Sequence, residues 1–196
     1  MRRDQLEHLI RAAGAITNEY EFVVIGSQSI LGAFPHAPAE LLESMEADLY
    51  PLQRPELADL IDGAIGEMST FNEHFGYYAQ GVGPETAVLP EGWRDRLLRV
   101  QGPSTDLRIG WCLEPHDLAA AKLAAGREKD KTFVLGMLRH GMIDPSELCS
   151  RLDDMPISEQ RAQILRLWVG LAVATAQGPQ DREAMAPPSG APEGDR

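Results

Sequence analysis

A short apolar stretch that ends in Gly-Ser is the feature of this sequence that most restricts how the chain folds. Residues 21–26 read EFVVIG, which predicts a strand that stops at a tight turn. Ser27 then begins SQSILGAF, which predicts a short helix, and residues 45–50 read MEADLY, which predicts another strand. This succession places a β-sheet in the first half of the chain.

The rest of the pattern places strands before residue 113 and helices after residue 117. Further strands are predicted over 75–82, 95–101 and 105–113. Helices are predicted at the N-terminus, where Asp4 and Glu7 fit a capping box, and over 55–68, 117–126, 127–141, 144–152 and 158–176. Gly126 fits a C-cap between two of these helices, although one continuous helix also fits the same residues.

This layout predicts an α+β fold. We expect an α/β core over residues 1–113 and a helical C-terminal subdomain over residues 114–176. From residue 177 to residue 196 the chain is rich in Gly, Pro and charged residues without periodicity, which predicts a disordered tail.

Charge and composition narrow the classes of partner. The formal net charge is −12, which disfavours nonspecific binding to duplex DNA but allows a local basic site or a small substrate carried with Mg²⁺. No apolar run is long enough to cross a bilayer, and the N-terminus lacks the apolar core of a secretory signal, so we expect a cytoplasmic protein without membrane contact. Cys112 and Cys149 are expected to be buried, reduced thiols.

The acid-x-acid triplet of MEADLY is the first candidate site. Strand alternation puts Glu46 and Asp48 on one face, roughly 7 Å apart, where their charges repel unless solvent or a cation lies between them. Oxygen ligands of this kind suit Mg²⁺. The alternative is a half-buried strand with one solvated face.

Gly26 and Ser27 form the second candidate site. Gly26 allows the backbone to approach a ligand closely, and the amides at the start of the following helix suit an anion. The alternative is an ordinary helix cap, and the segment has no Walker lysine.

Taken together, the strand, Gly-Ser, helix and acidic strand resemble the nucleotidyltransferase-fold superfamily, the polymerase-β-like group. The resemblance implies a mixed β-sheet core flanked by helices. It implies that Gly26 and Ser27 bind the β- and γ-phosphates of a nucleoside triphosphate (NTP). It also implies that Glu46 and Asp48 bind two metal ions that stabilise an in-line displacement at phosphorus.

A later segment, LEPHDLAAAKLAAGREKDKTFV, resembles the AbiEii-type branch of bacterial abortive-infection toxins. The resemblance implies that Lys122 is catalytic and, with Arg127, Lys129 and Asp130, belongs to the nucleotide-binding site. Lys122 and Lys129 share a face if the helix is continuous. The alternative is a solvated helix with surface charges. The chain from residue 20 to about residue 145 also resembles a widespread bacterial nucleotidyltransferase-like group.

The sequence departs from the superfamily pattern at the third carboxylate. Gln80 stands where an acid would be convenient, and Asp106 and Glu114 flank the last strand without a definite place. A base from the substrate or from His74 is the alternative.

Two hypotheses remain from the sequence. The first is an Mg²⁺-dependent enzyme that transfers a nucleoside monophosphate to an RNA end or a protein hydroxyl, with a toxin or phage-defence role implied by the resemblance. The second is a catalytically degenerate binding module that acts as a regulatory or antitoxin partner.

Overall fold

A computed structural model describes residues 1–176, so the tail predicted from residue 177 onward lies outside the described residues. The chain forms a five-stranded mixed sheet with the strand order β3-β2-β1-β5-β4. The strands are β1 (Glu21–Val24), β2 (Glu46–Pro51), β3 (Tyr78–Gly81), β4 (Leu98–Val100) and β5 (Ile109–Cys112). The sheet and the helices that follow it confirm the predicted α+β fold with C-terminal helices.

The central strand β1 explains why the sheet is mixed. β1 pairs antiparallel with β2 and parallel with β5, while β2 pairs parallel with β3 and β5 antiparallel with β4. Phe22, Val23 and Val24 of β1 are fully buried, as expected for a strand covered on both faces.

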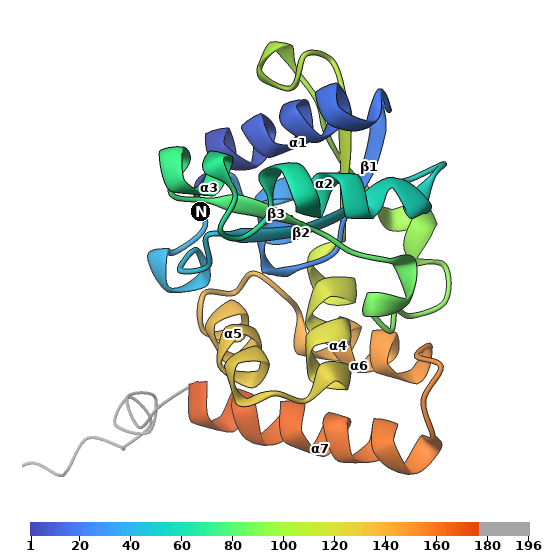
Figure 1. The fold of residues 1–196 in the computed structure, drawn as a ribbon. Helices are drawn as coiled ribbons and strands as arrows, with labels where there is room; N and C mark the ends of the chain where they lie inside the picture. The colour runs from blue at the N-terminus through green and yellow to red at the C-terminus, as the bar shows by residue number, and fades with distance from the viewer. Residues whose placement is uncertain (177–196) are drawn as a thin grey trace, which may run out of the picture.

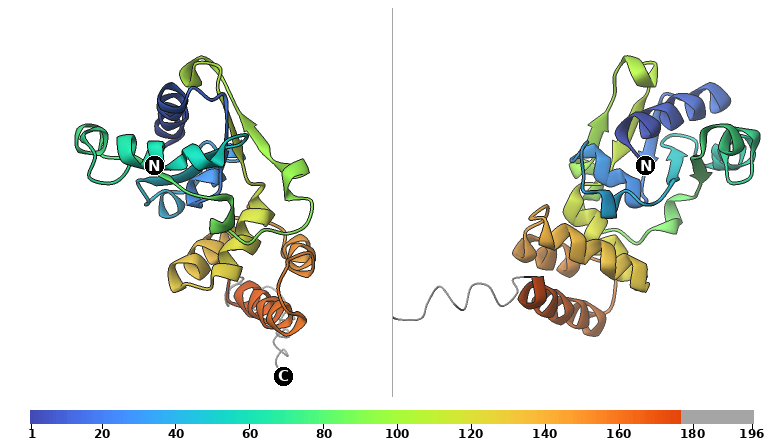
Figure 2. Two further views of the ribbon diagram at one scale, coloured as in Figure 1. Left: turned by 45° about the vertical axis from the view of Figure 1, so that its right-hand side comes forward. Right: turned by 90° about the vertical axis from the view of Figure 1, so that its left-hand side faces the viewer.

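Helices cover the two faces of the sheet, as Figures 1 and 2 show. Over one face lie α1 (Arg3–Thr17), α2 (Ala58–Ile65) and, beside α2, α3 (Thr70–Phe75). On the other side lie α4 (Pro115–Ala125) and α5 (Glu128–Arg139). There α6 (Pro145–Asp153) packs against α4, and α7 (Glu159–Ala176) packs against α5 and α6. The 3₁₀-helices η1 (Ser27–Gly32) and η2 (Ala39–Leu41) contact α4 and α5, respectively.

The predicted capping box at the N-terminus is wrong by two residues. The helix begins at Arg3, and the Arg2 backbone N–H donates to Oε1 of Gln5 at 2.7 Å. Asp4 pairs with Arg2 instead of capping the helix, and Glu7 pairs with Arg3.

The segment 75–82 is only partly a strand. Its first residue belongs to α3, because Ser69 caps that helix by accepting a hydrogen bond from the Asn72 amide, and Gly76 ends it at φ 74°. The strand begins only at Tyr78. The aromatic residues favour a strand locally, but the two caps decide the boundary.

Three other predicted segments are longer than the elements observed. Residues 55–68 contain the 3₁₀-helix η3 (Pro55–Leu57) followed by α2, which ends before Gly66. The regions of β4 and β5 also contain η5 (Trp93–Arg96) and η6 (Pro103–Thr105), and β3 is followed by η4 (Pro84–Thr86).

The C-terminal helices begin and end at residues that the sequence indicates. Gly126 adopts φ 74° and ends α4, so two separate helices are present rather than one. Asp144 caps α6 by accepting from the amides of Ser146 and Glu147, with Pro145 at the first helical position. None of the helices in residues 1–176 combines the length and apolar character that a bilayer crossing requires. The division into two domains stays a prediction.

Candidate functional site

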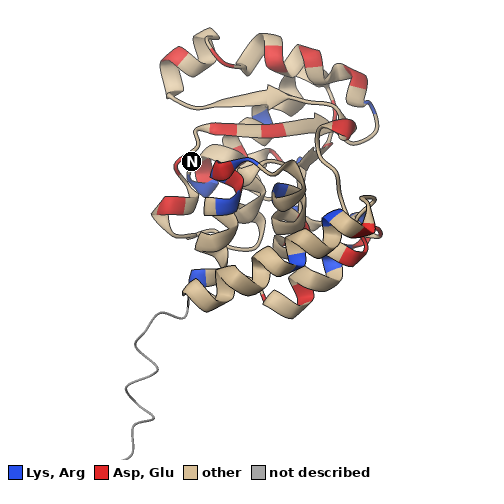
Figure 3. Ribbon diagram, turned by 90° about the horizontal axis from the view of Figure 1, so that it is seen from below, with Lys and Arg blue, Asp and Glu red and all other residues tan. Residues whose placement is uncertain are grey.

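A cavity of about 920 Å³ lies between the sheet and the helices α4 and α5. Figure 3 views the protein from the side of the C-terminal helices and shows acidic and basic positions on the surrounding elements. All eight residues that the sequence assigns to metal or nucleotide line this cavity: Gly26, Ser27, Glu46, Asp48, Lys122, Arg127, Lys129 and Asp130. Segments separated by about a hundred residues of chain therefore meet at one cavity.

The glycine of the Gly-Ser pair is required by a close contact with β2. A Cβ atom at Gly26 would lie 1.7 Å from Oδ2 of Asp48. The φ of Gly26 is −78°, so space rather than backbone conformation demands glycine here. The Ile25 amide also donates to the Asp48 carbonyl at 3.0 Å. The Asp48 carboxylate thus lies against the start of η1, beside Ser27.

The two carboxylates of β2 share the cavity face, as strand alternation predicts. Glu46 and Asp48 are half-buried, whereas Ala47 and Leu49 are fully buried on the opposite face. Burial raises the pKa of Glu46, and the adjacent charge of Asp48 raises it further. Repulsion of this kind is relieved by a cation between the carboxylates.

Tyr78 on the neighbouring strand contacts the same carboxylate. Its hydroxyl donates to Oε2 of Glu46 at 3.4 Å. Burial and the Glu46 charge raise the pKa of Tyr78 to about 12, so its hydroxyl stays protonated at physiological pH. Tyr78 was not predicted as a site residue.

Lys122 enters the cavity from α4 as a buried cation. Its residue is 9% exposed, its Nζ lies 3.0 Å from Oδ1 of Asp130, and its ammonium lies 4.6 Å from the ring centre of Phe133. Burial lowers the pKa of Lys122, and the charges of Asp130 and Asp48 oppose that effect. The ammonium is therefore held in place at the cavity wall.

Asp130 joins two cations and is almost completely buried. Arg127 donates through Nε to Oδ2 of Asp130 at 2.6 Å and through Nη2 to Oδ1 at 3.3 Å. Burial acts to raise the pKa of Asp130, but the hydrogen bond from Arg127 and the charge of Lys122 lower it overall. Among the residues described, Asp130 thus orients Lys122 and Arg127 at the cavity.

One face of α5 adds two more cations to the cavity beside Lys122 and Arg127. Lys129 and Arg139 both line the cavity, are exposed, and form no ion pair within residues 1–176. Lys129 and Lys122 lie on different helices because Gly126 interrupts the chain, yet both reach the cavity. Arg139 was not predicted, although Lys129, Gly136 and Arg139 follow helical spacing.

Of the two strands beside β2, β3 carries no carboxylate. The register of β2 and β3 sets Asp48 opposite Gln80 and Glu46 opposite Tyr78. Within residues 1–176, no group of three or more His, Cys, Asp or Glu side chains is arranged to hold a metal ion.

The other candidates for a third acid or base lie elsewhere. His74 packs against Phe75 on α3 and does not line the cavity. Asp106 pairs with Arg108, and Glu114 caps α4. The structure therefore does not support His74 as the base of this site.

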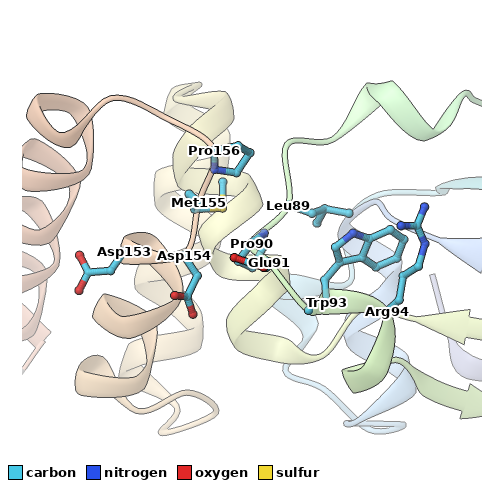
Figure 4. Close-up of a pocket in the computed structure, with 10 residues that line it drawn as sticks. Leu89, Pro90, Glu91, Trp93, Arg94, Asp153, Asp154, Met155 and Pro156 are labelled. Carbon is cyan, nitrogen blue, oxygen red and sulfur yellow. The ribbon is translucent and has the colours of Figure 1, made fainter.

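A second hollow, of about 640 Å³, lies between the loop before β4 and the connection from α6 to α7 (Figure 4). The guanidinium of Arg94 lies 4.7 Å from the ring centre of Trp93 there, and Asp153 pairs with Arg166. None of the predicted site residues lines this hollow.

One known protein family matches most of the chain. Residues 4–166 match the family model described as "Nucleotidyltransferase of unknown function (DUF6036)". The chain belongs to this nucleotidyltransferase family. No curated protein and no solved structure matches the chain. Membership confirms the resemblance to nucleotidyltransferases, and the AbiEii-type branch stays a prediction.

Proposed function

We propose that this member of the nucleotidyltransferase family transfers a nucleoside monophosphate from an NTP to an acceptor, with Mg²⁺ as cofactor. The observation that carries the proposal is the meeting of the Glu46–Asp48 pair with the cations of α4 and α5 across one cavity. Carboxylates suit the metal, and ammonium and guanidinium groups suit the triphosphate.

The carboxylates of Glu46 and Asp48 are suitable ligands for the metal. Glu46 and Asp48 would hold Mg²⁺, since burial and then the charge of Asp48 raise the pKa of Glu46, and a cation favours the ionised carboxylates. When bound, Mg²⁺ neutralises charge on the phosphates and polarises the phosphoryl group under attack.

The phosphates would contact the opposite wall and the Gly-Ser turn. Lys122 has three N–H donors and uses one on Asp130, which leaves donors for phosphate oxygens. Gly26 and Ser27 line the cavity beside Asp48, and we assign to them the contact with the β- and γ-phosphates. Lys129 adds charge at the cavity edge.

The acceptor would be an RNA end or a protein hydroxyl, and a toxin or phage-defence role with a cognate antitoxin or regulator follows from the resemblance to the AbiEii-type branch.

The second candidate function is a degenerate binding module. Its support is Gln80, which is neutral at the position opposite Asp48.

Transfer of labelled nucleotide tests the proposal. The purified protein, incubated with each α-labelled NTP, Mg²⁺ and total RNA or protein from a bacterial lysate, should label an acceptor. Asp48→Asn should abolish labelling, whereas Glu73→Gln, at an exposed position outside the cavity, should leave it unchanged. Equal labelling by Asp48→Asn would refute the metal assignment, and NTP binding without transfer to any acceptor would favour the binding module.

A further inference from the structure

Gln80 is the nearest cavity-facing neighbour of Asp48 on the adjoining strand. β2 and β3 are parallel and pair Asp48 with Gln80, so their Cα atoms are neighbours across roughly 5 Å. Gln80 lines the cavity and is exposed, whereas the next residue toward the N-terminus, Ala79, is fully buried. A side chain at position 80 therefore meets whatever Asp48 binds.

Three other acids line the cavity, and none of them stands on the strand beside Asp48. Glu43 is exposed and precedes β2 in the chain. Asp130 is held by Lys122 and Arg127. Glu40 of η2 pairs with His140, at the end of α5, at 2.8 Å. Among residues 1–176, no third acid joins Glu46 and Asp48 in a metal-holding group.

We propose that Gln80 restricts this site to one divalent cation, held by Glu46 and Asp48, in place of the pair of ions that the fold resemblance implies. The inference rests on the proposed function, because it concerns the metal that accompanies the NTP.

The charge of the ligands decides the number of ions. Two divalent ions in a two-metal site lie about 3.5–4 Å apart and repel each other, so anionic groups must offset their charge from both sides. A single Mg²⁺ keeps several waters and needs only one or two carboxylates plus phosphate oxygens. Glu46 and Asp48 meet that need, while Gln80 contributes at most a neutral amide oxygen.

The second position on β3 is neutral as well. Tyr78 stands opposite Glu46 and donates its hydroxyl hydrogen to that carboxylate at 3.4 Å. It therefore gives Glu46 a hydrogen bond but adds no negative charge for a second ion. Neither neighbour on β3 thus supplies negative charge to a second ion.

Counting bound Mn²⁺, which replaces Mg²⁺ and is visible by electron paramagnetic resonance, tests the proposal without measuring activity. The full chain is dialysed to equilibrium with Mn²⁺ and a non-hydrolysable NTP analogue, and metal, nucleotide and protein are measured on both sides. The wild type should hold one Mn²⁺ per chain with the spectrum of an isolated ion. Gln80→Asp should hold two with an exchange-coupled spectrum, and the neutral control Gln80→Asn should hold one.

Each result supports or overturns the proposal. Two ions in the wild type, or one ion in a folded Gln80→Asp variant, would overturn it. Circular dichroism establishes folding, and position 80 is exposed, so both variants should fold. A wild type that binds nucleotide analogue but holds two ions contradicts only the one-ion inference, whereas a wild type that binds neither nucleotide nor Mn²⁺ contradicts the proposed function too.

Discussion

Replacing Asp130 by Asn should destabilise the protein mainly by leaving the ammonium of Lys122 buried without a counter-charge. Lys122 and Asp130 have side chains that are 10% and 1% exposed, and their ion pair measures 3.0 Å. Removing one partner of a buried pair costs about 3–5 kcal/mol. We expect about 3 kcal/mol, because the Asn oxygen still accepts a hydrogen bond and the cavity admits water to Lys122.

The pH dependence of this variant follows from the pKa of Lys122. Burial already lowers that pKa, and loss of Asp130 lowers it further. The unfolded chain then binds the proton more tightly than the folded chain, so the stability of the variant rises with pH until lysine deprotonates in the unfolded state as well. The destabilisation at pH 7 should therefore shrink toward pH 10.

Urea denaturation followed by circular dichroism at pH 7 and pH 9 measures both effects. The double variant Lys122→Met/Asp130→Asn should recover stability relative to Asp130→Asn, because a neutral side chain of similar length needs no counter-charge. Glu128→Gln, which breaks the exposed pair with Lys131, should change stability by less than about 1 kcal/mol. An Asp130→Asn variant as stable as the wild type, or a double variant less stable than the single one, would refute the reasoning.

Three further changes test other parts of the cavity. Gly26→Ala should displace the Asp48 carboxylate, since the new Cβ would lie 1.7 Å from Oδ2. Mn²⁺ binding, measured by dialysis, should weaken at least tenfold. The unfolding free energy should fall by about 1–3 kcal/mol. Lys129→Ala should raise the Kd for an NTP several-fold at low salt and less at 0.5 M salt, because this exposed cation attracts phosphate through solvent. Calorimetry at the two salt concentrations measures the change in Kd. Glu46→Gln should raise the Tm of the metal-free protein at pH 7 while reducing Mn²⁺ binding. The pKa of Glu46 is raised in the fold, so its ionisation destabilises the metal-free protein as pH rises, and an unchanged or lower Tm would contradict that sign.

The sequence alone could predict the features that depend on local periodicity. The alternation of MEADLY places Glu46 and Asp48 on one face because a strand has a period of two residues, whatever its neighbours are. Gly126 and Asp144 mark helix ends because their roles depend on a few adjacent residues.

Features that depend on tertiary contacts could not be predicted in the same way. The need for glycine at position 26 comes from Asp48 on another strand, and the partner of Asp48 on β3 depends on a parallel pairing across the sheet. The role of Arg139 requires the end of α5 to lie beside the cavity, which helical spacing alone does not establish.

Isothermal titration calorimetry with an NTP and Mg²⁺ tests the central claim most directly. It measures whether the carboxylates of Glu46 and Asp48 and the cations of α4 and α5 bind one metal–nucleotide ligand together. The account predicts that the wild type binds at least one of the four NTPs when Mg²⁺ is present and that binding weakens at least tenfold without Mg²⁺ or in Asp48→Asn. The control Glu73→Gln should bind as the wild type does. Absence of binding to every NTP, or equal affinity of Asp48→Asn and wild type in Mg²⁺, would contradict the account.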